Sequence, residues 1–365
     1  MFAAAFFLVF APAPSAAAVD LDSLLNSLDD LLRPEFIPIV HAYVAYEHAA
    51  RRLIESPHDD EALDVLETSR SALEHAARSL ATMDSAESVS IPGLLSVEAA
   101  GQDSFYEFDY LILIDLGGND TYQNNAGGSN AFDEIGRTCS HETTVVGWSA
   151  FLLDLAGNDS YVPTRACGVN GGGAKGAGTL IDLSGDDIYD APGWRTNGGA
   201  FMGFGYLRDE RGNDLYTSTE FGVNGGAYGP GLGTLIDLAG DDVYRAALFG
   251  TNGGGVDFGR GSLFDLDGYD EYLADGAGVN GGGLSGFGTL VDVAGNDRYT
   301  AGTWAVNGGA AALSNCFCPP GVGVLIDLGG HDVYRSSDAE WEDRSLIPNE
   351  ETGMTVDSDD DSPTP

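Results

Sequence analysis

The chain has 365 residues, enough for two ordinary domains or for one repetitive domain with a smaller partner, and 43% of them are hydrophobic, which suffices for a core. Its formal net charge is -41, from 57 acidic and 16 basic residues. No basic surface that neutralises phosphates can form, which excludes nucleic acid and an anionic membrane surface as partners. Such a charge attracts cations, as in a calcium-rich exterior or a halophilic, high-salt habitat that screens self-repulsion.

Residues 1–18 are expected to be a secretory signal peptide. An apolar run is followed by small residues, and Ala16 to Ala18 fits a cleavage site before Val19. An uncleaved anchor is the alternative. The four cysteines, Cys139, Cys167, Cys316 and Cys318, agree with an oxidising exterior. We therefore expect a secreted or cell-surface protein, and we expect Cys139 to pair with Cys167 because the repeat described below places them about one coil apart.

Residues 19–98 are predicted to be a small helical segment. Three stretches have helical periodicity, "DLDSLLNSLDDLL", "EFIPIVHAYVAYEHAARRLIE" and "DDEALDVLETSRSALEHAARSLATM". In the third stretch Leu66, Leu73 and Leu80 lie seven residues apart on one face. This helix is amphipathic and needs a partner. His41, Glu47 and His48 could be imagined as metal ligands, but a half-exposed helical face explains them better.

From residue 111 onward the chain repeats a motif such as "LIDLAGDDVY", and the copies follow one another after 27 or 28 residues except at two insertions, 133–144 and 314–320. We call the aspartate that ends the apolar run the first aspartate, and the one five residues later the second aspartate. The first aspartates are Asp115, Asp154, Asp182, Asp209, Asp237, Asp265, Asp292 and Asp327. The second aspartates are Asp120, Asp159, Asp187, Asp214, Asp242, Asp270, Asp297 and Asp332. A tyrosine follows two residues after each second aspartate, and an asparagine, usually in "NGG", follows later.

A short unit with a β-branched run, a Gly-Asn/Asp turn, a second strand and a glycine-rich return is typical of a parallel β-solenoid, in which each unit forms one coil. A β-propeller is the alternative, but its blades usually need about 40 residues or more. We expect residues 99–337 to form an all-β parallel β-solenoid of about eight coils, with a right-handed β-helix favoured. Residues 338–365 are expected to be an acidic disordered tail.

Alternation along the strand places an invariant leucine on the same face as the first aspartate, so this face is predicted to point inward. The opposite face is apolar in most copies but carries Arg208 and Glu210 in one. A covered surface is therefore expected there, and the amino-terminal helices are the nearest cover. Equivalent residues of successive coils should stack, the asparagines through their amides and the tyrosines through their rings.

The aligned aspartates raise a problem of charge. Two carboxylates one coil apart, at roughly 4.8 Å, repel by about 1 kcal/mol in water and by about 3 to 4 kcal/mol at an effective dielectric constant near 20. One solution is a calcium ion held by carboxylates of adjacent coils and by turn carbonyls. The other is local, because each aspartate can accept backbone N–H bonds of its own turn.

The turns "GGND", "AGND", "AGDD" and "GGHD", each followed by x-Tyr, resemble those of RTX calcium-binding repeats. The resemblance implies that the second aspartates, such as Asp187 and Asp242, bind Ca²⁺ between coils and that folding depends on the ion. The chain departs from that family in its period, which is 27 to 28 residues instead of nine, and in its first aspartates. We take both aspartate rows as candidate metal ligands.

The sequence therefore predicts an acidic scaffold or adhesion module with structural calcium. Its expected partners are cations and, beyond these, extracellular polysaccharide or surface proteins. The alternative is a carbohydrate-active β-helix enzyme, a polysaccharide lyase or hydrolase with its site near loop 131–147, or a carbohydrate-binding module using Trp194 or Trp304. "CSHE" in that loop could bind zinc, although a disulfide is more ordinary. We predict no catalytic residues, because a catalytic carboxylate pair should be unique whereas these pairs recur in every copy.

Overall fold

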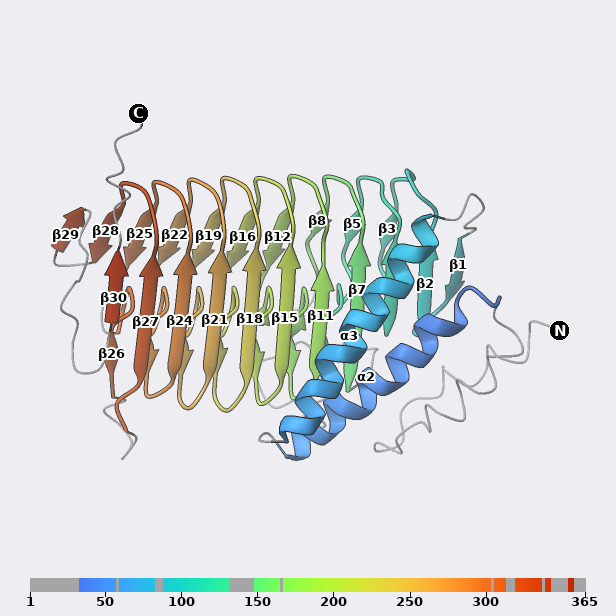
Figure 1. Cartoon of the computed structure of the whole chain (residues 1–365), viewed down its shortest axis with the longest axis horizontal. Coiled ribbons are helices and arrows are strands. Elements are labelled where there is room, and N and C mark those ends of the chain that lie inside the picture. Colours follow the sequence, from blue (N-terminus) through green and yellow to red (C-terminus); the bar gives the residue numbers. More distant parts are fainter. Residues whose placement is uncertain are drawn as a thin grey trace.

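The computed structural model describes residues 33–56, 59–82, 88–130, 148–164, 167–302, 305–312, 319–336, 339–342 and 354–357. Two helices, α2 (Ile37–Glu55) and α3 (Asp60–Ala81), precede a long solenoid of mainly parallel strands (Figure 1). The predicted fold class is thus confirmed. The expected signal peptide, loop 131–147, Trp304, and the cysteines Cys139, Cys316 and Cys318 lie outside the described residues. No helix in the described part is long and apolar enough to span a membrane.

Sheet A has eleven strands, and every pair is parallel except β1 with β2. Its spatial order is β1 (Val89–Ile91), β2 (Leu95–Glu98), β4 (Ile112–Asp115), β7 (Ser149–Asp154), β11 (Ala177–Ile181), β15 (Phe204–Asp209), β18 (Leu232–Asp237), β21 (Arg260–Asp265), β24 (Phe287–Asp292), β27 (Val322–Asp327) and β30 (Met354–Asp357). Leu207 pairs with Leu235 and Asp209 with Asp237, so equivalent repeat positions are in register.

Sheet B follows the aspartate turns and has ten strands, β29 (Ala339–Glu342), β28 (Val333–Ser336), β25 (Arg298–Ala301), β22 (Glu271–Ala274), β19 (Val243–Ala246), β16 (Leu215–Ser218), β12 (Ile188–Ala191), β8 (Ser160–Tyr161), β5 (Thr121–Tyr122) and β3 (Phe105–Tyr106). Sheet C, the glycine-rich return, has seven short strands, β26 (Ala310–Ala311), β23 (Gly283–Leu284), β20 (Gly255–Val256), β17 (Ala227–Tyr228), β14 (Ala200–Phe201), β10 (Gly173–Ala174) and β6 (Ser129–Asn130). A further pair joins β9 (Cys167–Val169) to β13 (Trp194–Thr196).

Two predicted boundaries are wrong. Strands β1 and β2 belong to sheet A although they fall inside the segment predicted as helical, because Leu95 to Glu98 repeats the alternation of the coils and pairs with β4. Strands β29 and β30 lie in the tail predicted as disordered. The acidic composition hid β30, in which Val356 and Asp357 pair with Ile326 and Asp327 of β27.

The interior is built from stacked identical residues. The leucines of sheet A face the tyrosines of sheet B in one buried cluster. Tyrosine rings of adjacent coils lie nearly parallel, as for Tyr189 and Tyr216, with centroids 4.7 Å apart. The predicted asparagine stack is also present, since Asn197 Nδ2 donates to Asn224 Oδ1 at 3.0 Å. These asparagines have φ near +50°, which asparagine tolerates better than most residues.

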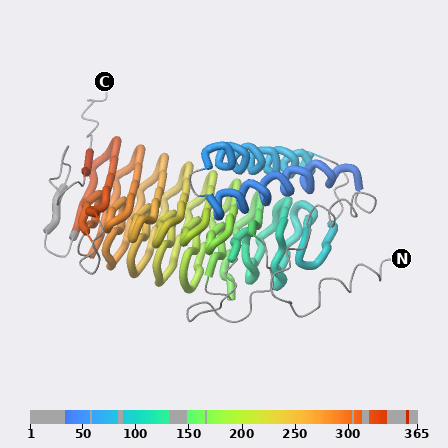
Figure 2. Tube along the Cα trace, turned by 90° about the horizontal axis from the view of Figure 1, so that it is seen from below, coloured from blue at the N-terminus to red at the C-terminus, as the bar shows by residue number. Residues whose placement is uncertain are grey.

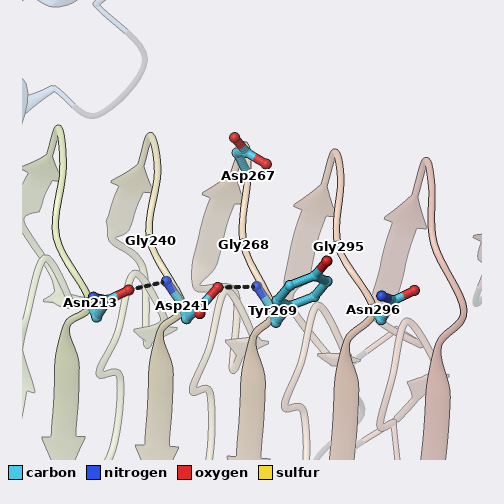
Figure 3. Close-up of a pocket in the computed structure, with 8 residues that line it drawn as sticks. All are labelled: Asn213, Gly240, Asp241, Asp267, Gly268, Tyr269, Gly295 and Asn296. Atoms are coloured by element: carbon cyan, nitrogen blue, oxygen red, sulfur yellow. Dashed lines mark hydrogen bonds between the residues drawn. The ribbon is translucent and has the colours of Figure 1, made fainter.

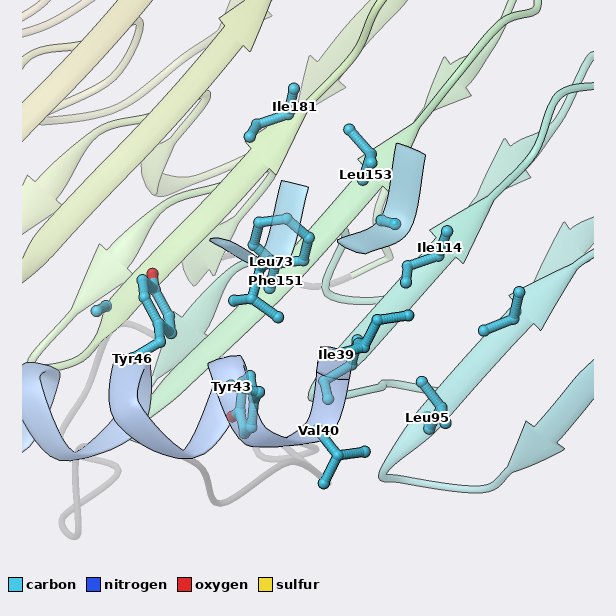
Figure 4. Packing of buried hydrophobic residues seen from close by; sticks show 14 of the residues in the cluster. Ile39, Val40, Tyr43, Tyr46, Leu73, Leu95, Ile114, Phe151, Leu153 and Ile181 are labelled. Atoms are coloured by element: carbon cyan, nitrogen blue, oxygen red, sulfur yellow. The ribbon is translucent and has the colours of Figure 1, made fainter. Parts of the chain in front are cut away.

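The helices cover the outer face of sheet A at its amino-terminal strands, as the views in Figures 1 and 2 agree. Asp59 caps α3 by accepting the N–H of Ala62 at 3.0 Å, which fixes where this helix begins. Leu73, predicted to need a partner, is buried against the apolar side chains of sheet A, Phe151 among them (Figure 4). The expected covered surface is thus confirmed.

Polar contacts fix the position of the helices on the sheet. Tyr43 donates its hydroxyl to the carbonyl of Ser149 at 2.8 Å. Arg208, on the outer face of β15, donates to Glu74 of α3 at 2.6 Å and to Glu210 at 3.1 Å. Arg78 completes the group through Glu210 at 2.8 Å. The charged residues that looked out of place on an apolar face are therefore partners of the covering helix.

We predict that Leu73→Ala lowers the free energy of unfolding by about 2 to 5 kcal/mol, because it removes a fully buried side chain between helix and sheet. Urea denaturation followed by circular dichroism measures the loss. Val65→Ala on the exposed side of α3 is the control and should change stability by less than about 0.5 kcal/mol. Equal losses from the two substitutions would contradict the helix packing described above.

Candidate metal centre

The first aspartates end the strands of sheet A, except that Asp182 directly follows β11, and all eight are fully buried. Alternation turns them inward with the leucines, as predicted. In each case a carboxylate oxygen, Oδ2, accepts the hydroxyl of the tyrosine in the preceding coil. Tyr216 donates to Asp237 at 2.6 Å and Tyr244 to Asp265 at 2.7 Å. Each bond therefore joins sheet B of one coil to sheet A of the next.

The other oxygen of most first aspartates accepts a bond from its own turn. Asp209 Oδ1 accepts the N–H of Arg211 at 2.9 Å, and Asp237 Oδ1 accepts that of Ala239 at 3.2 Å. The same bond forms at Asp115, Asp154, Asp182 and Asp327. The local solution expected from the sequence is therefore present, and it supplies donors to the first aspartates.

The second aspartates bond to the neighbouring coil. From Asp159 onward, Oδ1 of each accepts the backbone N–H of the preceding second aspartate, as from Asp214 to Asp242 at 2.6 Å and from Asp242 to Asp270 at 2.7 Å, and Asp120 Oδ1 accepts the N–H of Ser104. Their side chains are buried. Among the described residues, no donor reaches the other oxygen, Oδ2, in Asp120, Asp159, Asp187, Asp214, Asp242, Asp270 and Asp297. A row of buried acceptor oxygens without donors thus runs along the solenoid.

The two rows converge into groups of three carboxylates. Asp214, Asp237 and Asp242 form one group, and Asp242, Asp265 and Asp270 form the next. Within each group, one oxygen per residue lies within 4.8 Å of the others. Asp242 also lies within hydrogen-bonding reach of Asp237. The structure therefore brings together the candidate ligands of both predicted rows.

Burial and mutual repulsion oppose ionisation of these groups. Burial, followed by the charges of Asp237 and Asp265, raises the pKa of Asp242 from 3.8 to about 10. Burial raises the pKa of Asp159 to about 7 despite the hydrogen bond from Asp120 N–H. No ion pair to a basic residue is found at the first aspartates, or at the second aspartates from Asp120 to Asp297, within the described part of the chain. The rows must therefore bind cations or retain protons.

Three other residues that the sequence singled out, Glu47, Trp194 and Cys167, lie outside the aspartate rows. Glu47 is buried rather than half-exposed, and it accepts bonds from Arg51 at 2.8 Å and Ser149 at 2.5 Å, so it serves the helix–sheet contact. Trp194 is half-buried and packs on the ring of Phe221 at 4.7 Å rather than standing exposed. Cys167 is disulfide-bonded, but its partner lies outside the described residues, so pairing with Cys139 stays a prediction.

Sequence reasoning missed the role of the tyrosines as donors to the first aspartates. The signal was present in the constant spacing of seven residues from each first aspartate to the tyrosine after it, as from Asp237 to Tyr244. That spacing was interpreted as ring stacking alone. The hydroxyl reaches the first aspartate of the next coil, which can be seen only once the coils are in register.

Comparisons with protein family models, with curated proteins and with solved structures gave no match. The resemblance to RTX repeats thus stays a prediction from the turn sequences.

Proposed function

We propose that the protein is a secreted or cell-surface scaffold module whose coils are cross-linked by calcium ions bound between the two aspartate rows. The observation that carries this proposal is the row of buried Oδ2 oxygens of the second aspartates from Asp120 to Asp297, which no donor in the described part of the chain reaches. Each of these oxygens belongs to a carboxyl group beside a buried first aspartate, as Asp242 lies beside Asp237. An ion there would neutralise both.

The chemistry of the donors favours calcium over other metals. The groups offer only carboxylate oxygens, which are ligands of hard cations, and no imidazole or thiolate that would favour zinc. Calcium bonds to oxygen are about 2.3 to 2.6 Å long, so oxygens up to 4.8 Å apart can contact one ion from opposite sides. One divalent ion per coil also balances the charge of one first and one second aspartate.

Proton retention is the second candidate for neutralising the rows. Asp242 is within hydrogen-bonding reach of Asp237, and a proton on Asp242 would satisfy both groups. Either solution leaves a rigid rod with an acidic exterior that presents hydrated surfaces to partners. A carbohydrate-active enzyme gains no specific support, because the carboxylate groups in the described part recur along the rod instead of forming one distinct site.

We predict that calcium raises the thermal midpoint of unfolding. Each site that binds only the folded chain adds about 2.7 kcal/mol when free calcium is 100-fold above its dissociation constant. Differential scanning calorimetry with calcium and with a chelator, at equal ionic strength and pH 7, measures the difference. Magnesium at the same concentration is the control, because its strict octahedral demand should give a smaller rise. An unchanged midpoint would rule out structural calcium.

In chelator, we predict that stability falls as the pH rises from 5 to 9. The folded-state pKa values are raised, to about 7 for Asp159 and about 10 for Asp187 and Asp242, above an unfolded value near 3.9. The stabilising contribution is therefore complete below pH 4 and is lost as the pH rises through these values. Thermal midpoints across this range test it, and calcium should flatten the profile. A midpoint that rises with pH in chelator would contradict the assigned shifts.

We predict that Asp242→Asn reduces the calcium-dependent rise in the midpoint, because it removes one charged ligand. Asp241→Asn is the matched control, since Asp241 is exposed and asparagine occupies the same position at Asn158 and Asn213. The asparagine amide can also donate to Asp237, as a protonated Asp242 would. If Asp242→Asn instead raises the midpoint in chelator and leaves the calcium response intact, protons neutralise the rows.

A further inference from the structure

A second row of side chains runs along the outside of the aspartate turns. The residue before each second aspartate is usually Asn or Asp, and its Oδ1 accepts the backbone N–H of the equivalent residue in the next coil. Asn213 accepts from Asp241 at 2.9 Å, and Asp241 accepts from Tyr269 at 3.1 Å (Figure 3). The same bond joins the earlier coils from Asp103 to Asn213. This exposed chain of bonds gives the outer edge of the rod a regular polar surface.

Tyr269 interrupts this row. Its side chain has no amide or carboxylate oxygen with which to accept the N–H of Asn296, and that N–H has no protein acceptor among the described residues. The row resumes one coil later, where Asn296 accepts from His331 at 2.7 Å. The side chain is instead 62% exposed, second only to Phe108 at 66% among the large hydrophobic side chains of the described residues. An aromatic ring thus replaces a structural hydrogen bond at one coil.

An open groove of about 450 Å³ lies at this interruption. Three glycines, Gly240, Gly268 and Gly295, contribute no side chains to it. Its polar groups are the side chains of Asn213, Asp241, Asp267, Tyr269 and Asn296. Among the described contacts, the Asp267 carboxylate, the Tyr269 hydroxyl and the side-chain NH2 of Asn296 have no partner within the protein, whereas Asn296 Oδ1 accepts the N–H of His331. The groove therefore combines one exposed ring with several uncommitted hydrogen-bonding groups.

We propose that this groove binds a neutral saccharide. A pyranose has an apolar face that stacks on an aromatic ring and hydroxyl groups that bond to carboxylates and amides, which are the two features present here. The carboxylates of Asp241 and Asp267, together with a net charge of -41, disfavour a uronic acid or sulfated sugar. Stacked rings in these coils lie 4.7 to 4.9 Å apart, close to the length of one sugar unit, so a chain laid along the rod meets one coil per unit.

The groove is separate from the buried aspartate rows, so this inference does not rest on calcium. Its residues are on the surface, whereas Asp270 and Asp297, which follow Tyr269 and Asn296, point inward. Failure of the calcium proposal would therefore leave saccharide binding intact, and the reverse also holds.

Isothermal titration with cellohexaose and with hexa-N-acetylchitohexaose, both neutral, tests the proposal. The wild-type chain should bind at least one of them and should bind an oligogalacturonate of the same length at least tenfold more weakly. Tyr269→Asn removes the ring but supplies the missing acceptor for Asn296, so it should keep or raise the thermal midpoint while weakening sugar binding at least tenfold. Tyr269→Trp should retain binding, because it keeps a stacking surface.

Phe258→Asn is the matched control, since Phe258 is 52% exposed but lies outside the groove. It should leave sugar binding unchanged. The proposal is overturned if the wild-type chain binds neither neutral hexasaccharide, or if Tyr269→Asn binds as well as the wild type. Equal binding of the acidic oligomer would also overturn it, because the charge of the groove would then play no part in recognition.

Discussion

The hydrogen bond between a tyrosine of one coil and the first aspartate of the next determines how this solenoid is assembled. Tyr216 belongs to sheet B and Asp237 to sheet A of the following coil, so this bond ties two sheets and two coils together. It also requires a carboxyl group in a dry interior. A second aspartate lies beside this carboxyl group in the same turn, so negative charge accumulates at the corner between sheets A and B.

The positions of the two insertions show that the turn between sheets A and B does not vary in length, whereas the turn between sheets C and A does. Both fall between a strand of sheet C and the next strand of sheet A, after β6 in one case and after β26 in the other. Between sheets A and B, where the aspartates lie, the two aspartates stay five residues apart in every copy. An added residue there would displace the second aspartate from the N–H of its neighbour, as at Asp214 and Asp242. In the described part of the chain, no row of bonded carboxylates lies between sheets C and A, where both insertions fall.

Much of the fold could be predicted because its signals are repeated. The constant positions of Leu235, Asp237 and Tyr244 in their repeat indicate where the strands lie, which side chains point inward and how neighbouring strands align. Arg208 indicated which face of sheet A is covered. The terminal strands β2 and β30 could not be found in this way, because each departs from the motif and acquires its identity only by pairing with a neighbour. For the site, the sequence predicted which carboxylates gather. It did not predict that, among the described residues, donors reach one oxygen of the second aspartates from Asp120 to Asp297 and not the other.

Helices α2 and α3 cover sheet A at its amino-terminal strands and not further along. The resistance of the coils to local opening therefore differs along the rod. Each coil contacts mainly its two neighbours, so local opening spreads from whichever end is less secured. The end near β2 is fastened by the apolar contacts of α2 and α3 and by the Arg208 group. The end near β30 has no such fastening in the described part. We therefore expect the amino-terminal coils, which the helices hold, to open less readily than the coils that α2 and α3 do not contact.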